Sequence, residues 1–512
     1  MAIINLLLSP SVLAVGFVAF IAFYYIYPYY TTNGHLRDIP APFPAQFTNW
    51  WLLYACRRGK RYLIVDELHK KLGTVVRIQP NHVSIADDDA IPVIYGHGNG
   101  FLKSEFYDAF VSIKRGLFNT RDRAEHTRKR KLVSHVFAPK SVLQFEPYIT
   151  NNLELFADRW DELAATSPRS DKSAHVDCLK WFNYVAFDTI GDLAFGAPFG
   201  MLKAGADIAE VRSSLRAKPI FAPAVEILNR RGEVSATLGC YPSIKPYASW
   251  LPDPFFSKGL TAVQNLAGIA IARVKDRLEN PPDINRKDLL ARLQEGRDEK
   301  GEPLGFEELT AEALTQLIAG SDTTSNSSCA VLYWAVRTPG VLQKLQAELD
   351  AAIPSRDQKV PDYESIRNLP YLEAAIQEAL RIHSTSGIGL PRQVPPDSPG
   401  VYLNGHFFPP GAVLSVPTYT IHHSKTIWGP DADEYRPERW LNITPRQRNA
   451  YLVFSHGPRA CVGRNVAEME MKMIAATWMC RYDVFLRQDY MDTREGFLRK
   501  PLALEIGFRR RT

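Results

Sequence analysis

Cysteine is scarce in this 512-residue sequence, and the six cysteines form no CxxC pair. This spacing argues against a zinc site and a disulfide scaffold, so we expect most of the chain to lie in a reducing compartment. Basic residues exceed acidic ones by only 61 − 55 = 6, which gives little support to nucleic-acid binding. No repeat with a period of about 20 to 50 residues is visible. Hydrophobic residues at 46% and charged residues at 23% indicate an ordinary globular protein, most simply one large domain.

Charged side chains are absent from residues 1–34, and Ile3 to Tyr27 forms a nearly continuous apolar run. At about 1.5 Å per residue, a helix of this length crosses a hydrocarbon layer of about 30 Å. Aromatic residues between positions 23 and 30 suit a membrane interface, and the basic residues from Arg37 onward predict that the remainder lies on the cytosolic side. A cleaved secretory signal is the alternative, but the run is too long and no basic residue precedes it.

The sequence therefore divides into three segments: a membrane anchor over residues 1–34, a proline-rich connector over residues 35–50, and a globular domain over residues 51–512. The prolines between Pro40 and Pro44 predict an extended, stiff connector.

The sequence of the globular domain predicts mainly helices with a few small sheets. Alternating apolar residues around Val76 and Val83 predict one hairpin, and Asn404-Gly405 predicts a second, because this dipeptide accepts positive φ in a tight turn. Apolar stripes that begin at Leu372 and at Val466 predict two amphipathic helices. The sequence shows no alternation of strands and helices, so it gives no indication of a parallel sheet.

The stretch from Phe306 to Thr338 is long enough for one helix that ends at Pro339-Gly340. Its centre, Ser321 to Ser328, consists of residues that favour helices poorly, because short polar side chains compete for backbone hydrogen bonds. Two interpretations remain open: a loop between two helices, or one locally distorted helix whose polar groups face a site.

The strongest signal for chemistry is the loop from Phe454 to Gly463, which contains Cys461 and directly precedes a predicted helix. A cysteine before a helix N-terminus meets partial positive charge, which favours the thiolate that binds metal. Gly457 and Gly463 permit a tight turn and a close approach to a flat ligand, and Arg459 can pair with an anionic group on that ligand. The alternative is a buried structural cysteine.

The pattern FxxGxRxCxG, filled here from Phe454 to Gly463, resembles the haem-binding signature of the cytochrome P450 superfamily. The resemblance implies the P450 fold, mainly α with small β-sheets, preceded here by an N-terminal transmembrane helix. It further implies haem b as cofactor, with the thiolate of Cys461 as axial ligand of the iron. By the same resemblance, Glu378 and Arg381 match the family's ExxR motif, and Arg439 in the PERW segment completes a buried network that braces the haem loop.

The same resemblance assigns roles on the other face of the haem. Gly320 would make room for dioxygen, and Asp322 with Thr323 would deliver protons to it. His126 and Arg130 occupy the places of a family WxxxR pair that contacts the haem propionates, with histidine in place of tryptophan, and Arg392 is a further propionate candidate. The neighbouring basic residues are predicted to be solvated and able to attract an acidic partner: Arg121, Arg123, Arg128, Lys129 and Lys131.

Within the superfamily, the sequence most resembles the fungal benzoate 4-monooxygenases. The resemblance runs over nearly the whole chain, including segments outside the haem motifs that begin at Gly96, Trp181 and Asn229. It implies para-hydroxylation of benzoate to 4-hydroxybenzoate with dioxygen, and electrons from NADPH through NADPH-cytochrome P450 reductase. It also implies a single-pass protein of the endoplasmic reticulum membrane whose catalytic domain faces the cytosol.

The substrate carboxylate would need a cation or several hydrogen-bond donors in the cavity. The candidates, which the sequence does not rank, are Lys103, Ser104, Ser112, Lys114, Arg115, Arg230 and Arg231.

Alternatives to this function are a monooxygenase for another small aromatic or phenolic substrate, a haem-thiolate isomerase or dehydratase of hydroperoxides, and a non-catalytic, membrane-anchored haem sensor. The motif at Asp322 and Thr323 argues against the last two, since neither function needs a proton relay.

Overall fold

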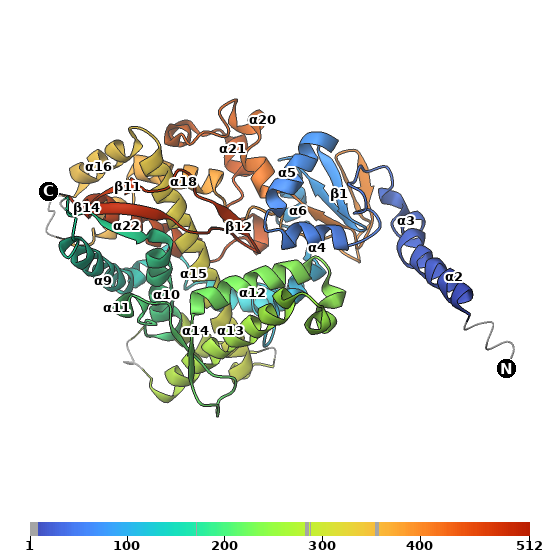
Figure 1. Cartoon of the computed structure of the whole chain (residues 1–512), viewed down its shortest axis with the longest axis horizontal. Coiled ribbons are helices and arrows are strands. Elements are labelled where there is room, and N and C mark those ends of the chain that lie inside the picture. Colours follow the sequence, from blue (N-terminus) through green and yellow to red (C-terminus); the bar gives the residue numbers. More distant parts are fainter. Residues whose placement is uncertain are drawn as a thin grey trace.

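The computed structural model describes residues 9–169, 171–281, 286, 288–298, 300–353 and 358–511. Helices dominate, as predicted, and three of the long ones surround the longest, α15 (Phe306–Arg337), which contacts α10, α13 and α22 through the middle of the body (Figure 1). The other helices of at least eight residues in the body are α4 (Trp50–Arg57), α5 (Arg61–Leu72), α7 (Arg123–Ser134), α9 (Glu146–Ala165), α10 (Cys178–Phe195), α12 (Ala224–Gly239), α13 (Pro254–Glu279), α16 (Val341–Ala352), α18 (Pro370–Ile382) and α22 (Arg464–Arg481).

Shorter helices connect these elements. They are α6 (Ala90–Tyr95), α8 (Pro139–Val142), α11 (Met201–Ala204), α14 (Leu289–Gln294), α17 (Tyr363–Ile366), α19 (Thr418–His422), α20 (Lys425–Trp428) and α21 (Pro445–Ala450), with the 3₁₀ helices η3 (Glu105–Phe110), η5 (Pro242–Trp250) and η6 (Pro437–Asn442) among others.

The strands form small sheets. The largest has the order β1-β2-β10-β7-β3, a second has the order β11-β14-β4, and the pairs β12-β13, β5-β6 and β8-β9 stand alone. In Figure 1 the β1 sheet lies toward the N-terminal helix, and β11 and β14 lie toward the C-terminus. The strands are β1 (Val75–Gln79), β2 (His82–Ile85), β3 (Leu102–Lys103), β4 (Ala174–Asp177), β5 (Ala209–Val211), β6 (Ile220–Ala222), β7 (Arg392–Gln393), β8 (Val401–Leu403), β9 (His406–Phe408), β10 (Val413–Ser415), β11 (Tyr482–Leu486), β12 (Thr493–Glu495), β13 (Arg499–Pro501) and β14 (Glu505–Arg510).

Both predicted hairpins are confirmed. Strands β1 and β2 pair antiparallel, as do β8 and β9. Asn404 and Gly405 have φ values of 46° and 80° at the second turn, which is the backbone conformation that made this dipeptide a turn signal.

The polar stretch from Ser321 to Ser328 belongs to a continuous helix, so the loop interpretation is wrong and no distortion interrupts α15. Two of the hydroxyl groups donate hydrogen bonds within the helix: Ser321 donates to the carbonyl of Leu317 at 2.7 Å and Thr323 to that of Ala319 at 2.7 Å. Burial of the helix among α10, α13 and α22 outweighs the weak helix propensity of these residues.

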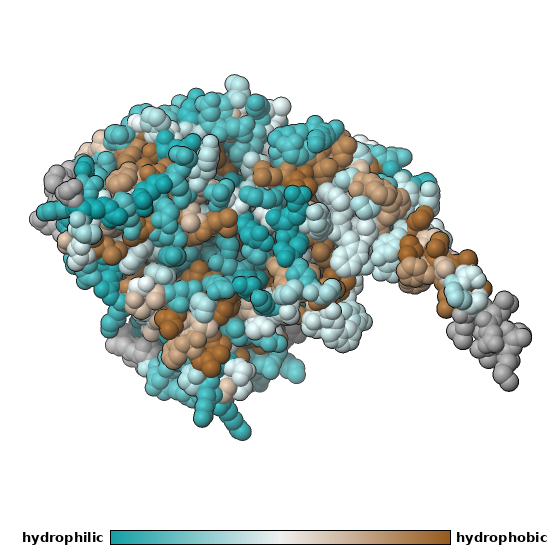
Figure 2. All heavy atoms as spheres, viewed as in Figure 1, coloured by the Kyte–Doolittle hydropathy of each residue, from teal (hydrophilic) through white to brown (hydrophobic). Residues whose placement is uncertain are grey.

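The N-terminal segment projects away from the body as α2 (Pro10–Ile21), a π-helical turn and α3 (Tyr27–Tyr30) (Figures 1 and 2). Among the described helices, one span, Pro10–Tyr30, is long and apolar enough to cross a membrane, with a mean hydropathy of 1.8 and no buried residue. The first eight residues of the predicted anchor lie outside the described residues.

The predicted connector is not a free spacer between anchor and body. Leu36 and Ile39 are buried in the cluster that covers the β1 sheet, and Ala45 is buried as well. The Pro40 carbonyl accepts a hydrogen bond from the Arg77 N–H at 2.9 Å. The globular body therefore begins before residue 51, because this stretch supplies apolar side chains to its core.

Candidate active site

A cavity of about 260 Å³ lies between the centre of α15 and the loop that precedes α22. Thr323 and Gly320 line it from α15, and Cys461 and Gly463 line it from the loop. Cys461 is exposed, and its exposure is to this internal cavity. The predicted metal ligand and the predicted oxygen-side residues thus share one enclosed space.

Hydrogen bonds and close packing fix the cysteine loop. The N–H of Cys461 donates to the carbonyl of Phe454 at 2.9 Å. Gly457 has φ +66°, and a Cβ there would lie 1.9 Å from the carbonyl oxygen of Tyr95, so only glycine fits. At Gly463, by contrast, a Cβ would meet only Phe137, at 3.9 Å, and would point into nearly open space. Position 463 therefore leaves room for something in the cavity.

The helix N-terminus acts on Cys461 in the predicted direction, but in the protein alone its effect on the thiol pKa is smaller than that of burial. Burial raises the pKa of the thiol, and this outweighs the N–H of Gly463 and the charge of Arg130, which lower it. A bound metal ion reverses this balance, since a coordinating thiol is deprotonated outright.

A cluster of cations borders the cavity on the α7 side. Lys103, His126, Arg130 and Arg459 line it. Burial and the charges of its neighbours lower the pKa of His126 to about 3, so its ring is neutral. Arg459 donates to the carbonyls of Thr120 at 2.7 Å and Arg121 at 3.0 Å, and Arg130 donates to that of Ala460 at 2.5 Å.

Arg392, the further residue predicted to contact a propionate, is buried beside this cluster, but it is not among the residues that line the cavity. Its guanidinium donates to the Tyr107 hydroxyl at 2.9 Å. Its strand neighbour Lys103, also buried, lines the cavity instead, and burial together with the charges of Arg392, Arg459 and Arg130 holds the pKa of Lys103 well below its usual value.

The predicted basic residues are not uniformly solvated, which corrects the prediction for three of them. Arg121 is half-buried and pairs with Asp108 at 2.8 Å. Lys129 is buried and pairs with Glu308 at 2.7 Å and Glu312 at 2.9 Å. Arg128 pairs with Glu125 at 2.7 Å and with Glu308. Glu308 and Glu312 lie on α15, so the two cations join α7 to α15, while Arg123 and Lys131 remain exposed.

On α15, Thr323 lines the cavity and Asp322 is not among the lining residues. Asp322 is buried, and burial raises the pKa of its carboxyl while the charge of Lys500 on β13 lowers it. Lys500 is half-buried, and this partial burial lowers its pKa. The structure thus places a carboxyl and an amine directly behind the cavity wall.

Gly320 lines the cavity, but a neighbouring helix also demands glycine there. A Cβ at this position would lie 2.6 Å from Cδ1 of Ile190 on α10. Close packing of α10 against α15 is therefore a sufficient reason for this glycine.

Glu470 is a functional candidate that the sequence analysis missed. It lies on α22 and lines the cavity, and burial raises its pKa to about 8, with the Thr324 hydroxyl opposing the shift through a hydrogen bond. A glutamate within an otherwise apolar stripe of a predicted helix was the available signal.

A second, smaller cavity of about 160 Å³ adjoins the first, since Phe118, Thr315, Ala319, Thr323 and Leu498 line both. Its remaining walls are largely apolar and include Phe110 and Phe497. Its volume is far below the roughly 300–1,000 Å³ typical of drug-sized ligand sites, so a single substituted ring suits it.

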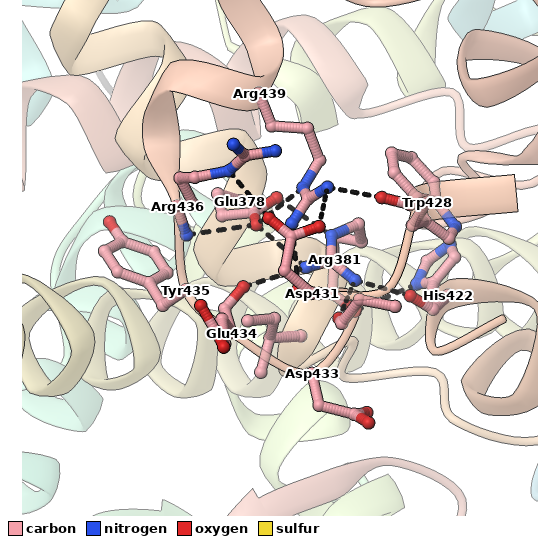
Figure 3. Close-up of polar contacts among 12 residues, drawn as sticks. Glu378, Arg381, His422, Trp428, Asp431, Asp433, Glu434, Tyr435, Arg436 and Arg439 are labelled. Atoms are coloured by element: carbon pink, nitrogen blue, oxygen red, sulfur yellow. Dashed lines mark hydrogen bonds and ion pairs between the residues drawn. The ribbon is translucent and has the colours of Figure 1, made fainter. Parts of the chain in front are cut away.

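The predicted network behind the cysteine loop is fully formed (Figure 3). Arg381 donates two hydrogen bonds of 2.8 Å to the carboxylate of Glu378, and Arg439 donates to the same carboxylate at 3.2 Å. The indole N–H of Trp440 and the backbone N–H of Arg436 donate further hydrogen bonds to the Glu378 carboxylate. Arg381 also donates to the carbonyls of His422 and Ala432, so one buried carboxylate joins α18 to the segment that leads into the cysteine loop.

The residues present fit a haem. The cavity has a cysteine at one wall, a glycine that leaves open space beside it, and cations that match the two propionates of the porphyrin. The one acidic residue among its lining, Glu470, is mostly protonated at neutral pH, so no described carboxylate competes for these cations.

Comparisons with known proteins agree with this geometry. The family model described as Cytochrome P450 matches residues 40–508. The chain is 60% identical to the benzoate 4-monooxygenase bphA of Aspergillus niger over 99% of this chain and 98% of that protein. It is 30% identical to a cytochrome P450 monooxygenase of Aspergillus terreus, over 96% and 98% of the two chains, and 30% identical to the cytochrome P450 monooxygenase gsfF of Penicillium aethiopicum, over 93% of each.

The match covers nearly the whole globular body. The cysteine and the threonine of α15 line one cavity, and the ExxR pair lies in the buried network behind the cysteine loop. The chain therefore belongs to the cytochrome P450 family.

Proposed function

We propose that this protein is a haem-thiolate monooxygenase that converts benzoate to 4-hydroxybenzoate. The observation that carries the proposal is the pair of adjoining cavities: one has Cys461 in its wall, and the other is small, aromatic and bordered by Thr323. The 60% identity to a benzoate 4-monooxygenase over nearly the full chain supports benzoate as the substrate.

When bound, the haem supplies activation of dioxygen and insertion of one oxygen atom into a C–H bond of the substrate. The thiolate of Cys461 holds the iron, and Lys103, His126, Arg130 and Arg459 bind the propionates and so orient the porphyrin.

Thr323 presents its hydroxyl oxygen to the cavity while its hydrogen is donated to Ala319. This oxygen can accept a hydrogen bond from a water and hold that water where a proton is needed. Asp322, with its raised pKa and Lys500 behind it, is placed to resupply protons from the far side of α15. Apolar walls keep bulk water away from the reacting atoms.

Electrons would come from NADPH through NADPH-cytochrome P450 reductase, since no described part of this chain offers a nicotinamide-binding fold. The exposed Arg123 and Lys131 on α7 are available to an acidic partner surface. The span Pro10–Tyr30 would anchor the protein in the endoplasmic reticulum membrane, with the body in the cytosol.

A second candidate is a monooxygenase for another one-ring aromatic, because the 160 Å³ cavity by itself selects size more than substituents.

Reconstitution of the full-length protein with haem, reductase and NADPH tests both. Benzoate, 4-methoxybenzoate, cinnamate and a steroid would be compared by binding spectra and product analysis. We expect benzoate to give 4-hydroxybenzoate with the highest kcat/KM. Faster turnover of the steroid would overturn the proposal, and faster turnover of another single-ring compound would favour the second candidate.

A further inference from the structure

Arg231 is a buried cation in the wall of the substrate-sized cavity. It lies on α12, is 4% exposed, and lines the 160 Å³ cavity together with Phe110, Phe118 and Thr323. Its guanidinium carbon lies 5.2 Å from the centre of the Phe110 ring, and one of its nitrogens donates to the Phe110 carbonyl at 3.0 Å.

No carboxylate of the described residues forms an ion pair with Arg231, and its Nε is buried without a hydrogen-bond partner. Burial alone lowers the pKa of Arg231, to about 10, and no acidic neighbour raises it again. A buried charge normally has a partner, because leaving a cation desolvated and unpaired is costly. This guanidinium therefore has unused capacity to bind an anion inside the cavity.

The other candidate anchors are committed elsewhere. Lys114, Arg115 and Arg230 are exposed and pair with Glu307, Asp108 and Glu226. The Ser104 side chain caps η3. Lys103 lies in the cation cluster at the other cavity and donates to the Phe118 carbonyl.

Two other candidates, Lys114 and Ser112, line the same cavity as Arg231. Lys114 is 54% exposed and already pairs with Glu307, which leaves Ser112 as the uncommitted donor. Its hydroxyl makes no hydrogen bond with the described residues.

From this juxtaposition we propose that Arg231 binds the carboxylate of the aromatic substrate, with the Ser112 hydroxyl as a second donor. The inference rests on the proposed function and adds the group that selects benzoic acids over neutral arenes. Arg231 lies on α12, whereas Thr323 lies on α15, which borders both cavities. A carboxylate held at Arg231 leaves the opposite end of the ring, the para carbon, free to extend toward the haem cavity. The position of the anchor thus decides which carbon is oxidised.

The test compares full-length wild type with Arg231→Met and Arg231→Lys as haem-loaded proteins. Binding of benzoate and of its uncharged analogue benzamide is measured by optical titration and by calorimetry. We expect Arg231→Met to raise the Kd of benzoate at least about tenfold, a loss of about 1.4 kcal/mol, and to change the Kd of benzamide less than about threefold. Arg231→Lys should recover part of the benzoate affinity, because it restores the charge but not the planar fork.

Arg230→Met is the matched control, because Arg230 is the adjacent arginine, exposed and paired with Glu226; its Kd for benzoate should equal that of wild type. Retention of haem reports whether Arg231→Met is folded. If that variant fails to fold, Ser112→Ala decides, with an expected rise of the benzoate Kd and no change for benzamide.

Unchanged benzoate binding in Arg231→Met would overturn the proposal, as would equal losses for benzoate and benzamide, which indicate a packing role. Production of 4-hydroxybenzoate by the wild-type protein is measured separately. A wild type that binds benzoate through Arg231 without producing 4-hydroxybenzoate contradicts the proposed function alone, and a wild type that binds no benzoate contradicts both.

Discussion

Replacement of Glu378 by glutamine tests whether the buried network holds the haem pocket together. The side chains of Glu378 and Arg381 are wholly buried, and that of Arg439 is 3% exposed. Glutamine keeps the shape of the side chain and removes its charge, so the two guanidinium groups lose their shared carboxylate. Asp431 remains near Arg439 at 3.2 Å, whereas Arg381 keeps only backbone carbonyls.

Removal of one partner from a buried ion pair costs about 3–5 kcal/mol, because it leaves an uncompensated buried charge. A whole domain is stable by about 5–15 kcal/mol. The single substitution therefore removes a large fraction of the free energy of unfolding. The lost interactions lie at the junction of α18 with the segment that leads to Cys461. We expect Glu378→Gln to lower the urea midpoint strongly and to lose haem during purification.

The matched control is Glu373→Gln on the same helix. The Glu373 side chain is 39% exposed and pairs with Lys472, and such partly solvated pairs contribute about 1 kcal/mol or less. Urea unfolding and haem content are measured for both variants at equal protein concentration. A Glu378→Gln protein that keeps its haem and unfolds within about 1 kcal/mol of wild type would refute the reasoning, and so would equal losses in the two variants.

Four further outcomes are expected. Cys461→Ser should shift the haem absorbance and lower benzoate turnover at least about 100-fold, because a hydroxyl does not replace a thiolate ligand; unchanged spectra would contradict the ligand assignment. Thr323→Ala should keep oxygen consumption while product formed per NADPH falls about tenfold or more, as measured by paired assays, because proton delivery is worth about 100-fold or more. Lys103→Met should weaken haem retention about tenfold in apomyoglobin exchange, since one charged hydrogen bond contributes about 1.5–3 kcal/mol. Because the pKa of Glu470 is raised to about 8 in the folded protein, the protein should lose stability as pH rises from the unfolded pKa of about 4.5 to 8, on the order of 5 kcal/mol in total; Glu470→Gln should flatten this slope in urea midpoints between pH 5 and pH 8.

Local patterns predicted the parts of the site that are fixed by neighbours in sequence. The cysteine loop is one turn followed by a helix, and the pair Glu378 and Arg381 lies on one helical face, so both are short local motifs that could be matched to the P450 family; the spacing of the pair alone would not have identified it. The turn at Asn404-Gly405 was predicted for the same reason, because positive φ is a property of the residues themselves.

Burial of charged side chains could not be predicted in this way. Lys129 and Lys131 lie in one basic run, yet the first pairs with Glu308 and Glu312, about 180 residues away in sequence, and the second is exposed. Arg230 and Arg231 are adjacent, and only tertiary packing decides which of them faces the cavity. The acidic residues Glu308 and Glu312, one helical turn apart, were the available signal for a buried partner of α7.

Hydroxyl side chains inside α15 satisfy two demands that otherwise conflict. A helix through the core must leave no polar hydrogen unpaired, and a site that handles protons needs a polar group at its wall. Thr323 donates its hydrogen to the Ala319 carbonyl of its own helix, so its burial costs no partner from elsewhere, and the lone pairs of its oxygen remain for a water in the cavity. Asp322, which directly precedes Thr323, turns toward Lys500 on the other side of the helix. A charged residue at the cavity wall in place of Thr323 would bind water more strongly but would also attract bulk solvent into an apolar chamber. The weak helix formers at the centre of α15 are therefore retained because the site requires their hydroxyl groups, and the surrounding helices supply the stability that these residues lack.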